Sequence, residues 1–159
     1  MDMMSRIQQA LDRQLTQACS PSSPPRLMAA MRHAVFPGGA RIRPQLCLAV
    51  ASACGEDAPE LTDAAAVAIE LLHCASLVHD DLPCFDDALT RRGVPTVHAA
   101  YGERIAVLTG DALIVLAFQA LAHAARHAPL DLPGLLSIVA QRVGAPTGIV
   151  AGQAWECEP

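Results

Sequence analysis

The sequence predicts an all-α protein. Its 159 residues are 52% hydrophobic and 17% charged, which excludes a disordered chain and is enough for the core of one domain. Apolar residues recur at helical spacing almost throughout, and no alternating run rich in β-branched residues competes with them. A formal charge of −5 and an aromatic content of 3% argue against general nucleic-acid binding.

Three short helices are expected first. An apolar residue at every fourth position predicts a helix over about residues 4–19. A proline-rich breaker follows, and its last two prolines suit the start of a second helix over residues 27–35. A Pro-Gly-Gly turn at residues 37–39 leads to a third helix over about residues 43–54, which Gly55 ends.

A long apolar helix is expected next. Thr62 and Asp63 are both candidates for its N-cap residue. The helix reaches about Asp81, because Pro83 cannot continue it. Residues 82–95 are rich in charges and breakers, and we expect them to form a loop.

A second long helix covers about residues 103–127, and a last one starts near Leu132, with a break at residues 144–146. Residues 105–125 are apolar enough to resemble a membrane span. Asp111 interrupts them, and a carboxylate inside a bilayer is costly. We therefore expect no membrane span. We expect Asp111 to be buried in a hydrogen-bonded contact between helices, and the alternative is that it is a partner of a metal site or of an arginine.

The cysteines do not predict a disulfide framework. No C-x-x-C spacing occurs, and most of the six cysteines lie in alanine-rich apolar stretches. We expect reduced, half-buried thiols in a cytoplasmic protein. The first residues contain no apolar stretch typical of a signal peptide.

Four aspartates crowd the end of the first long helix, within eight residues: Asp80, Asp81, Asp86 and Asp87. Two like charges 4 Å apart repel by about 4 kcal/mol at an effective dielectric constant near 20. On spacing alone, solvent and neighbouring arginines could offset this repulsion on a surface loop, or a hard cation such as Mg²⁺ could do so. Because a helix C-terminus disfavours anions, the metal site is the stronger interpretation.

Cationic and neutral donors accompany the aspartates. Arg91 and Arg92 follow them, and Arg41 and Arg43 follow the Gly-Gly turn. Guanidinium groups suit phosphate oxygens. His73 lies seven residues before the first aspartate, about 10 Å along the same helix face. Carboxylates for Mg²⁺ and arginines for anions together predict a site that handles a diphosphate.

Five segments resemble the trans-isoprenyl diphosphate synthase (polyprenyl synthetase) family. HDDLPCFDDALTRRG resembles its first aspartate-rich motif, DDxxxxD, in the bacterial form. FPGGARIRP resembles the family's G-G-K-R-x-R-P, and ELLH contains the family's histidine. LTGDAL and GIVAGQAWE resemble its G-D-x-L and G-Q segments. The five segments occur in the family's order over about residues 26–159. The resemblance is closest to the geranylgeranyl diphosphate synthases of bacterial carotenoid pathways.

The resemblance implies an isoprenoid-synthase helical bundle that condenses isopentenyl diphosphate with an allylic diphosphate, farnesyl or shorter, to geranylgeranyl diphosphate. It implies that Mg²⁺ carrying the allylic diphosphate binds to Asp80, Asp81 and Asp86. Arg91 would clamp the same diphosphate. The residues implied to hold isopentenyl diphosphate are Arg43, His73 and Arg92.

Product length depends, in this family, on the residues four and five positions before the first aspartate. These are Ser76 and Ala75 here, both small, so the resemblance implies a pocket long enough for a C20 product. An alternative is that the two small residues only let helices pack closely while another residue forms the floor of the pocket.

The sequence departs from the family in two respects. Ala40 stands where the family has lysine, and the chain contains no lysine at all. No second aspartate-rich motif, DDxxD, is present. We therefore expect residues 1–159 to be the N-terminal part of one synthase domain, inactive alone and dimeric in the complete enzyme.

Two other classes remain open at this point. The first is a non-catalytic helical subunit or interaction module that resembles a prenyltransferase. The second is an unrelated acidic Mg²⁺ binder. The paired arginines and the Gly-Gly-x-Arg-x-Arg turn disfavour the unrelated binder, because a simple cation site has no need of them.

Overall fold

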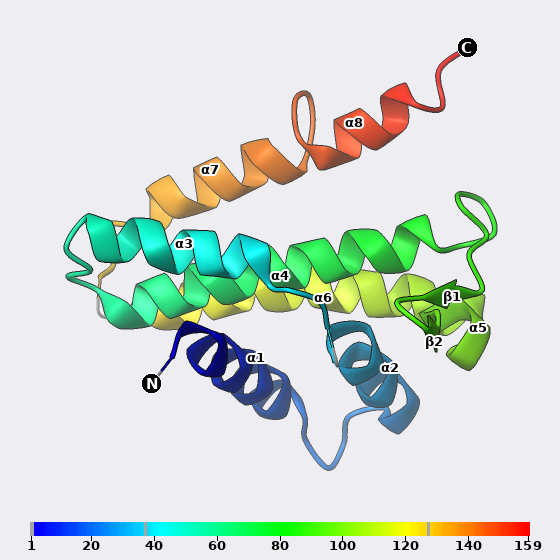
Figure 1. Ribbon diagram of the computed structural model, residues 1–159, viewed down its shortest axis with the longest axis horizontal. Coiled ribbons are helices and arrows are strands. Elements are labelled where there is room, and N and C mark those ends of the chain that lie inside the picture. The colour runs from blue at the N-terminus through cyan, green and yellow to red at the C-terminus, as the bar shows by residue number, and fades with distance from the viewer. Residues whose placement is uncertain (1, 37, 127) are drawn as a thin grey trace.

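The structure is a computed structural model that describes residues 2–36, 38–126 and 128–159 (Figure 1). Helices and one short hairpin make up its regular structure, which confirms the all-α class. The helices are α1 (Met3–Ala18), α2 (Pro25–Val35), α3 (Ile42–Ala53), α4 (Pro59–Asp80), α5 (Val97–Tyr101), α6 (Glu103–Ala124), α7 (Leu132–Val143) and α8 (Ile149–Trp155). The hairpin pairs β1 (Thr90–Arg91) with β2 (Val94–Pro95).

The long helices α4 and α6 lie side by side at the centre of the molecule and run in opposite directions (Figure 1). Their contact faces carry alanines and leucines, and Leu71 and Leu113 are fully buried there. Both helices are long and apolar enough to cross a membrane by length and composition. They bury 56% and 44% of those segments inside the protein, as central helices of a bundle do. The expectation of no membrane span stays a prediction.

The shorter helices cover this pair. α1 packs through Ile7, Leu11 and Leu15, all buried, which confirms the predicted apolar stripe. Pro25 occupies the first turn of α2, as the proline pair predicted. α3 lies along α4, and α7 and α8 form an arm above them that ends over the C-terminal end of α4 (Figure 1).

The predicted N-cap of α4 is wrong. The helix begins at Pro59 and its N-cap residue is Ala58, whose side chain makes no capping hydrogen bond. Proline needs no hydrogen-bond partner for its nitrogen in the first turn and has a φ suited to a helix. Thr62 instead donates its hydroxyl to the carbonyl of Ala58, 3.2 Å away, from inside the first turn.

The second half of the chain agrees with the sequence-based expectations in part. α6 ends at Ala124, and His127, where we expected its end, lies outside the described residues. α7 and α8 are separated at residues 144–148, which confirms the predicted break. Asp111 is not buried, since its side chain is 60% exposed; its carboxylate lies 3.9 Å from His79 of α4.

The six cysteines are all free, as expected. Only two are shielded, because Cys74 is buried and Cys47 is half-buried. The other four are exposed, so the expectation of half-buried thiols is wrong for them: Cys19, Cys54, Cys84 and Cys157. They lie at helix ends and in turns, where alanine-rich neighbours do not cover them.

Candidate functional site

The C-terminal end of α4 is covered by the loop that follows it. The loop turns back, and the amide of Asp86 donates to the carbonyl of Asp80 at 2.9 Å. The amide of Ala88 donates to the carbonyl of Asp81 at 3.2 Å. These bonds satisfy carbonyls that a helix end leaves without partners. They also bring Asp86 back beside Asp80, although six positions separate the two residues.

Other carboxylates surround the side chain of Asp80. Burial and then the Asp86 carboxylate raise the pKa of Asp80, and the carboxylates of Asp81 and Glu156 add to this effect. Arg91 opposes it. Among the described residues, no hydrogen bond or ion pair engages the Asp80 carboxylate. A cation at this point would therefore be stabilised by more than one negative charge.

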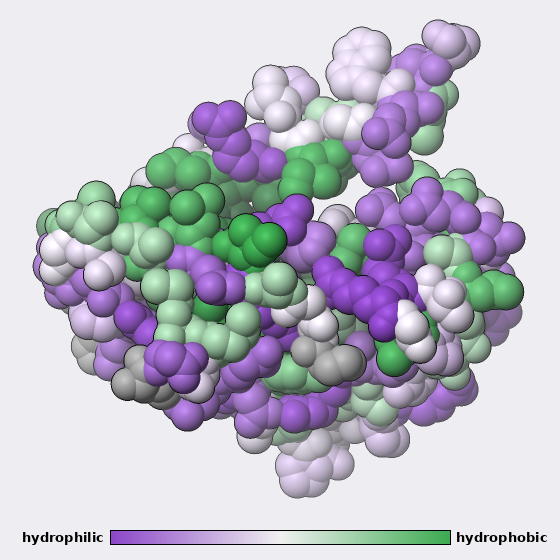
Figure 2. Space-filling view, in the orientation of Figure 1, coloured by the Kyte–Doolittle hydropathy of each residue, from purple (hydrophilic) through white to green (hydrophobic). Residues whose placement is uncertain are grey.

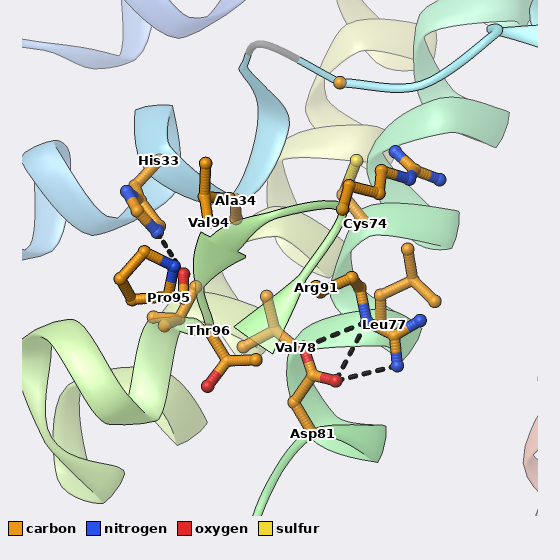
Figure 3. A pocket seen from close by; sticks show the side chains of 13 residues that line it. His33, Ala34, Cys74, Leu77, Val78, Asp81, Arg91, Val94, Pro95 and Thr96 are labelled. Carbon is orange, nitrogen blue, oxygen red and sulfur yellow. Dashed lines mark hydrogen bonds and ion pairs between the residues drawn. The ribbon is translucent and has the colours of Figure 1, made fainter. Parts of the chain in front are cut away.

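Asp81 is engaged differently. Its side chain is buried and accepts hydrogen bonds from Arg91 Nε at 2.8 and 3.1 Å, and Arg91 Nη2 lies 2.7 Å from Oδ1 (Figure 3). The three aspartates that we expected to bind Mg²⁺ are thus divided. Asp81 is occupied by Arg91. Asp86 is largely exposed and lies 3.9 Å from Arg91 Nη2, so its carboxylate and that of Asp80 can still take a cation.

The available carboxylates fit Mg²⁺ nonetheless. No group of three or more histidine, cysteine, aspartate or glutamate side chains forms a metal site within the described chain. Mg²⁺ does not require one, because it commonly takes one or two carboxylates and fills its other positions with water and substrate phosphate oxygens. Asp80 and Asp86 are the residues that would hold it.

The hairpin that carries Arg91 is anchored at its base by two histidines. His98 of α5 donates from Nε2 to the carbonyl of Ala88 at 2.9 Å, and Thr96 donates its hydroxyl to the same oxygen at 2.7 Å. His33 of α2 donates from Nε2 to the carbonyl of Pro95 at 2.7 Å (Figure 3). The sequence assigned these histidines no role, and no spacing in one sequence could have shown which carbonyls they reach.

A second group of residues lies where α3 begins. Arg43 and Arg92 are exposed there, and His73 is half-buried on α4. Burial lowers the pKa of His73, and so do Arg43, Arg92 and Arg91 in that order. Figure 2 shows a strongly hydrophilic patch between the start of α3 and the hairpin. The residues predicted to hold isopentenyl diphosphate are therefore close together.

The side chain of Arg92 crosses the Gly-Gly turn at Gly39. A Cβ atom on Gly39 would lie 2.6 Å from Cζ of Arg92. Arg92 itself adopts a left-handed φ of 54°. A side chain at position 39 would therefore displace the Arg92 guanidinium from this turn.

The missing lysine is not replaced by Arg41. Ala40 is exposed, and its carbonyl accepts a hydrogen bond from Gln45 Nε2 at 2.6 Å. Arg41 points inward and pairs with Glu70, with Nη1 and Oε1 2.5 Å apart. The exposed cations of this face are Arg43 and Arg92, so the face has one cation fewer than the family pattern.

An apolar cavity of about 500 Å³ opens beside the aspartates, between α4 and α8. Ser76, Asp80 and Phe85 line it from α4 and the loop, and Ile149 and Val150 line it from α8. Figure 2 shows the opening between the α8 end of the arm and the body of the protein. Ala75, one residue from Ser76, is 1% exposed and packs in the core. The structure thus brings only one of the two predicted chain-length residues to this cavity.

Comparison with known proteins gives the family. The model of the polyprenyl synthetase family matches residues 24–159. This chain belongs to the polyprenyl synthetase family. The resemblance drawn from the five segments is thereby confirmed.

Relatives of this polyprenyl synthetase chain are named as prenyl diphosphate synthases. A geranylgeranyl diphosphate synthase of Cereibacter sphaeroides is 57% identical over 96% of this chain and 53% of its own length. A probable farnesyl diphosphate synthase of Bradyrhizobium diazoefficiens is 45% identical over 96% of this chain and 45% of its own. The chain therefore spans about half the length of the curated relatives it matches.

Solved structures agree with the family fold. The apo crystal structure of an FPP/GFPP synthase from Zymomonas mobilis is 39% identical, with a TM-score of 0.86 over 98% of this chain and 56% of that one. The crystal structure of a geranyltransferase from Legionella pneumophila is 34% identical, with a TM-score of 0.82. The predicted isoprenoid-synthase bundle, represented by part of its helices, is confirmed.

Proposed function

We propose that this chain forms the first half of a prenyltransferase that condenses isopentenyl diphosphate with an allylic diphosphate to give geranylgeranyl diphosphate. One observation carries the proposal: two groups of side chains suited to diphosphate binding lie at the same end of the bundle, and an apolar cavity opens beside the first group. The names of the relatives support this chemistry. The DDxxxxD spacing of Asp80, Asp81 and Asp86 in this chain supports it as well.

The allylic diphosphate is assigned to the end of α4. Asp80 and Asp86 would hold Mg²⁺, and Arg91, fixed by Asp81, would donate to the same diphosphate. Bound Mg²⁺ would supply neutralisation of the charge that develops on the departing diphosphate. The apolar wall formed by Ser76, Phe85 and α8 would surround the prenyl chain and exclude water from it.

Isopentenyl diphosphate is assigned to Arg43, Arg92 and His73. The allylic C–O bond breaks with its electron pair leaving on the diphosphate, and the double bond of isopentenyl diphosphate attacks the allylic carbon. Loss of a proton completes a chain five carbons longer. Because its pKa is lowered, His73 is a neutral donor near pH 7, whereas the two arginines carry the positive charge.

The complete enzyme is proposed to be a homodimer that associates through α6. The outer face of α6 exposes three apolar side chains, Val107, Leu108 and Val115. Multi-angle light scattering of the complete enzyme tests this, with Leu108→Glu expected to give monomers. A dimer that survives the substitution would contradict the assignment to α6.

The activity is testable in a chimera that joins this chain to the remaining half of the Cereibacter sphaeroides relative. With farnesyl diphosphate, isopentenyl diphosphate and Mg²⁺, we expect geranylgeranyl diphosphate from the chimera and little or none from residues 1–159 alone. Asp80→Ala and Asp86→Ala should abolish product formation, whereas the exposed control Asp57→Asn should not. A folded chimera that binds both diphosphates without turnover would favour the non-catalytic subunit instead.

A further inference from the structure

Arg41 and Glu70 form an ion pair in the interior, one helical turn from His73. Their side chains are 0% and 4% exposed, and Nη1 lies 2.5 Å from Oε1. Arg41 Nη2 also donates to the carbonyl of Val35 at 2.5 Å. Of the two arginines that follow the Gly-Gly turn, Arg41 therefore faces away from the proposed substrate, whereas Arg43 is exposed.

Two features of Arg41 lower the stability that the ion pair can contribute. Arg41 adopts a left-handed backbone conformation with φ of 51°, which a residue with a side chain rarely takes. Its Nε is buried and has no hydrogen-bond partner among the described residues. Burial of two charges gains stability only where their geometry offsets the lost hydration. A strained, incompletely satisfied ion pair is therefore a poor way to gain stability alone.

The Arg41–Glu70 ion pair also connects the start of α3 to α4. Arg41 is the N-cap residue of α3 and stands two residues before Arg43. A Cβ on Gly38 would collide with the Arg41 guanidinium, and one on Gly39 would collide with that of Arg92. The Gly-Gly turn is thus held between two arginines, of which one is anchored in the core. Glu70 lies on the same helix as His73, so the ion pair ties the start of α3 to that helix.

We propose that Arg41 and Glu70 are positioning residues for the isopentenyl diphosphate site, and that their ion pair holds Arg43 and Arg92 against His73. The proposal rests on the function proposed above, because that function assigns isopentenyl diphosphate to these three residues. Neither Arg41 nor Glu70 touches the substrate. Their effect passes through the backbone of residues 38–43.

Two variants separate positioning from stability. Glu70→Gln leaves Arg41 charged, buried and partly unpaired, so it should lower both stability and ligand affinity. The double variant Arg41→Met/Glu70→Leu removes both charges and leaves apolar side chains of similar size, a change that is often neutral for stability. We expect the double variant to unfold near the wild-type temperature and still to bind isopentenyl diphosphate about 10- to 100-fold more weakly, the effect of a misplaced binding group.

Binding of isopentenyl diphosphate to this chain is measured by isothermal titration calorimetry. No allylic diphosphate is added, so the ligand binds without reacting. Arg43→Ala is the reference for direct contact, and Arg32→Met, which removes an exposed ion pair with Asp12, is the control. Hydrogen exchange of the amides of residues 40–45 is the second readout, and the double variant should accelerate it selectively. Wild-type affinity or unchanged exchange in a folded double variant would overturn the positioning role.

Failure of the proposed function has a different signature. If wild type does not bind isopentenyl diphosphate, or Arg43→Ala binds it as wild type does, the assignment of the ligand is wrong. Hydrogen exchange still reports in that case whether the ion pair fixes residues 40–45. If Glu70→Gln does not fold, the double variant alone decides the question.

Discussion

The guanidinium of Arg91 lies against the carboxylate of Asp81, with Nη2 2.7 Å and Nε 2.8 Å from the same oxygen, Oδ1. Asp81 is buried, and the arginine is its hydrogen-bonding partner. Charge-assisted hydrogen bonds of this kind hold both groups in one orientation. The second aspartate of the acidic cluster therefore orients an arginine. The third, Asp86, is 64% exposed and makes only a long contact with that arginine, 3.9 Å from Nη2.

Removal of Arg91 should destabilise the fold. Arg91→Ala leaves a buried carboxylate without its partner, so we expect the free energy of unfolding to fall by about 1–3 kcal/mol. Urea denaturation followed by circular dichroism measures this. Arg142→Ala, an exposed arginine of α7, is the control and should change little. Equal unfolding midpoints for the two variants would contradict the account of Asp81.

Asp80→Asn should stabilise the protein when no divalent cation is present. Burial and Asp86 raise the pKa of Asp80 above its ordinary value of 3.8, so the folded state binds this proton more tightly than the unfolded chain. The stability from this group is present at low pH and is lost as pH rises through the raised pKa. At pH 7 the substitution should raise the melting temperature by about 1–2 °C.

When Mg²⁺ and inorganic diphosphate are present, wild type should instead have a higher melting temperature than Asp80→Asn. Addition of Mg²⁺ and inorganic diphosphate together should raise the melting temperature of wild type, whereas that of Asp80→Asn should rise little. Asp57→Asn, an exposed aspartate before α4, is the matched control and should respond as wild type does. An equal gain in all three proteins would place the cation elsewhere.

His73 should give the stability of the protein a pH dependence below its ordinary pKa. Burial and Arg43 lower the pKa of His73 from 6.5 in the folded state. The unfolded chain then binds the proton more readily, so stability is present above pH 6.5 and is lost as pH falls. His73→Gln should flatten this loss between about pH 6.5 and 5, measured as the free energy of unfolding in urea. His123→Gln, an exposed histidine, should leave the loss intact.

Ser76 and Ala75 should respond differently to a large side chain. Ser76→Phe projects into the cavity beside α8, so it should weaken binding of farnesyl diphosphate in the presence of Mg²⁺ more than binding of dimethylallyl diphosphate. Ala75→Phe overfills the core and should lower the free energy of unfolding by about 1–3 kcal/mol. Ser76→Ala is the size control and should preserve both affinities. Selective loss of farnesyl binding in a stable Ala75→Phe variant would restore Ala75 as the length-determining residue.

Gly39→Ala should weaken anion binding without a comparable loss of stability. The added methyl group would meet the end of a flexible arginine side chain, which can move away at little cost. Arg92 would then leave its place beside Arg43, so affinity for isopentenyl diphosphate should fall by about 10-fold or more. Gly134→Ala on α7, where a Cβ meets nothing within 4 Å, should leave the affinity unchanged. Titration calorimetry distinguishes the two variants.

Much of the fold could be predicted because it depends on local patterns. The stripe Ile7, Leu11 and Leu15 identified α1, and the prolines before α2 identified its start. The start of α4 could not be predicted in this way. Ala58 has no side chain suited to capping. The helix begins instead at Pro59, whose nitrogen needs no hydrogen-bond partner in the first turn.

The candidate site was predictable as a list of residues and not as an arrangement. The crowding of four carboxylates at a helix C-terminus indicated a cation site, because that end of a helix disfavours anions. Which carboxylates are free depends on where the hairpin places Arg91. That placement depends in turn on His33 and His98, whose carbonyl partners lie 62 and 10 positions away in sequence.

The sequence by itself determined the helical class, the family and the residue types at the site, because periodicity and motif spacing are properties of local chain segments. Only the tertiary structure decided that Asp81 pairs with Arg91, that Arg41 is buried against Glu70, and that Ser76 rather than Ala75 reaches the cavity. Each of these outcomes depends on which side chains distant segments bring together in the interior. There, a charge must find a partner and a small residue must fit its neighbours.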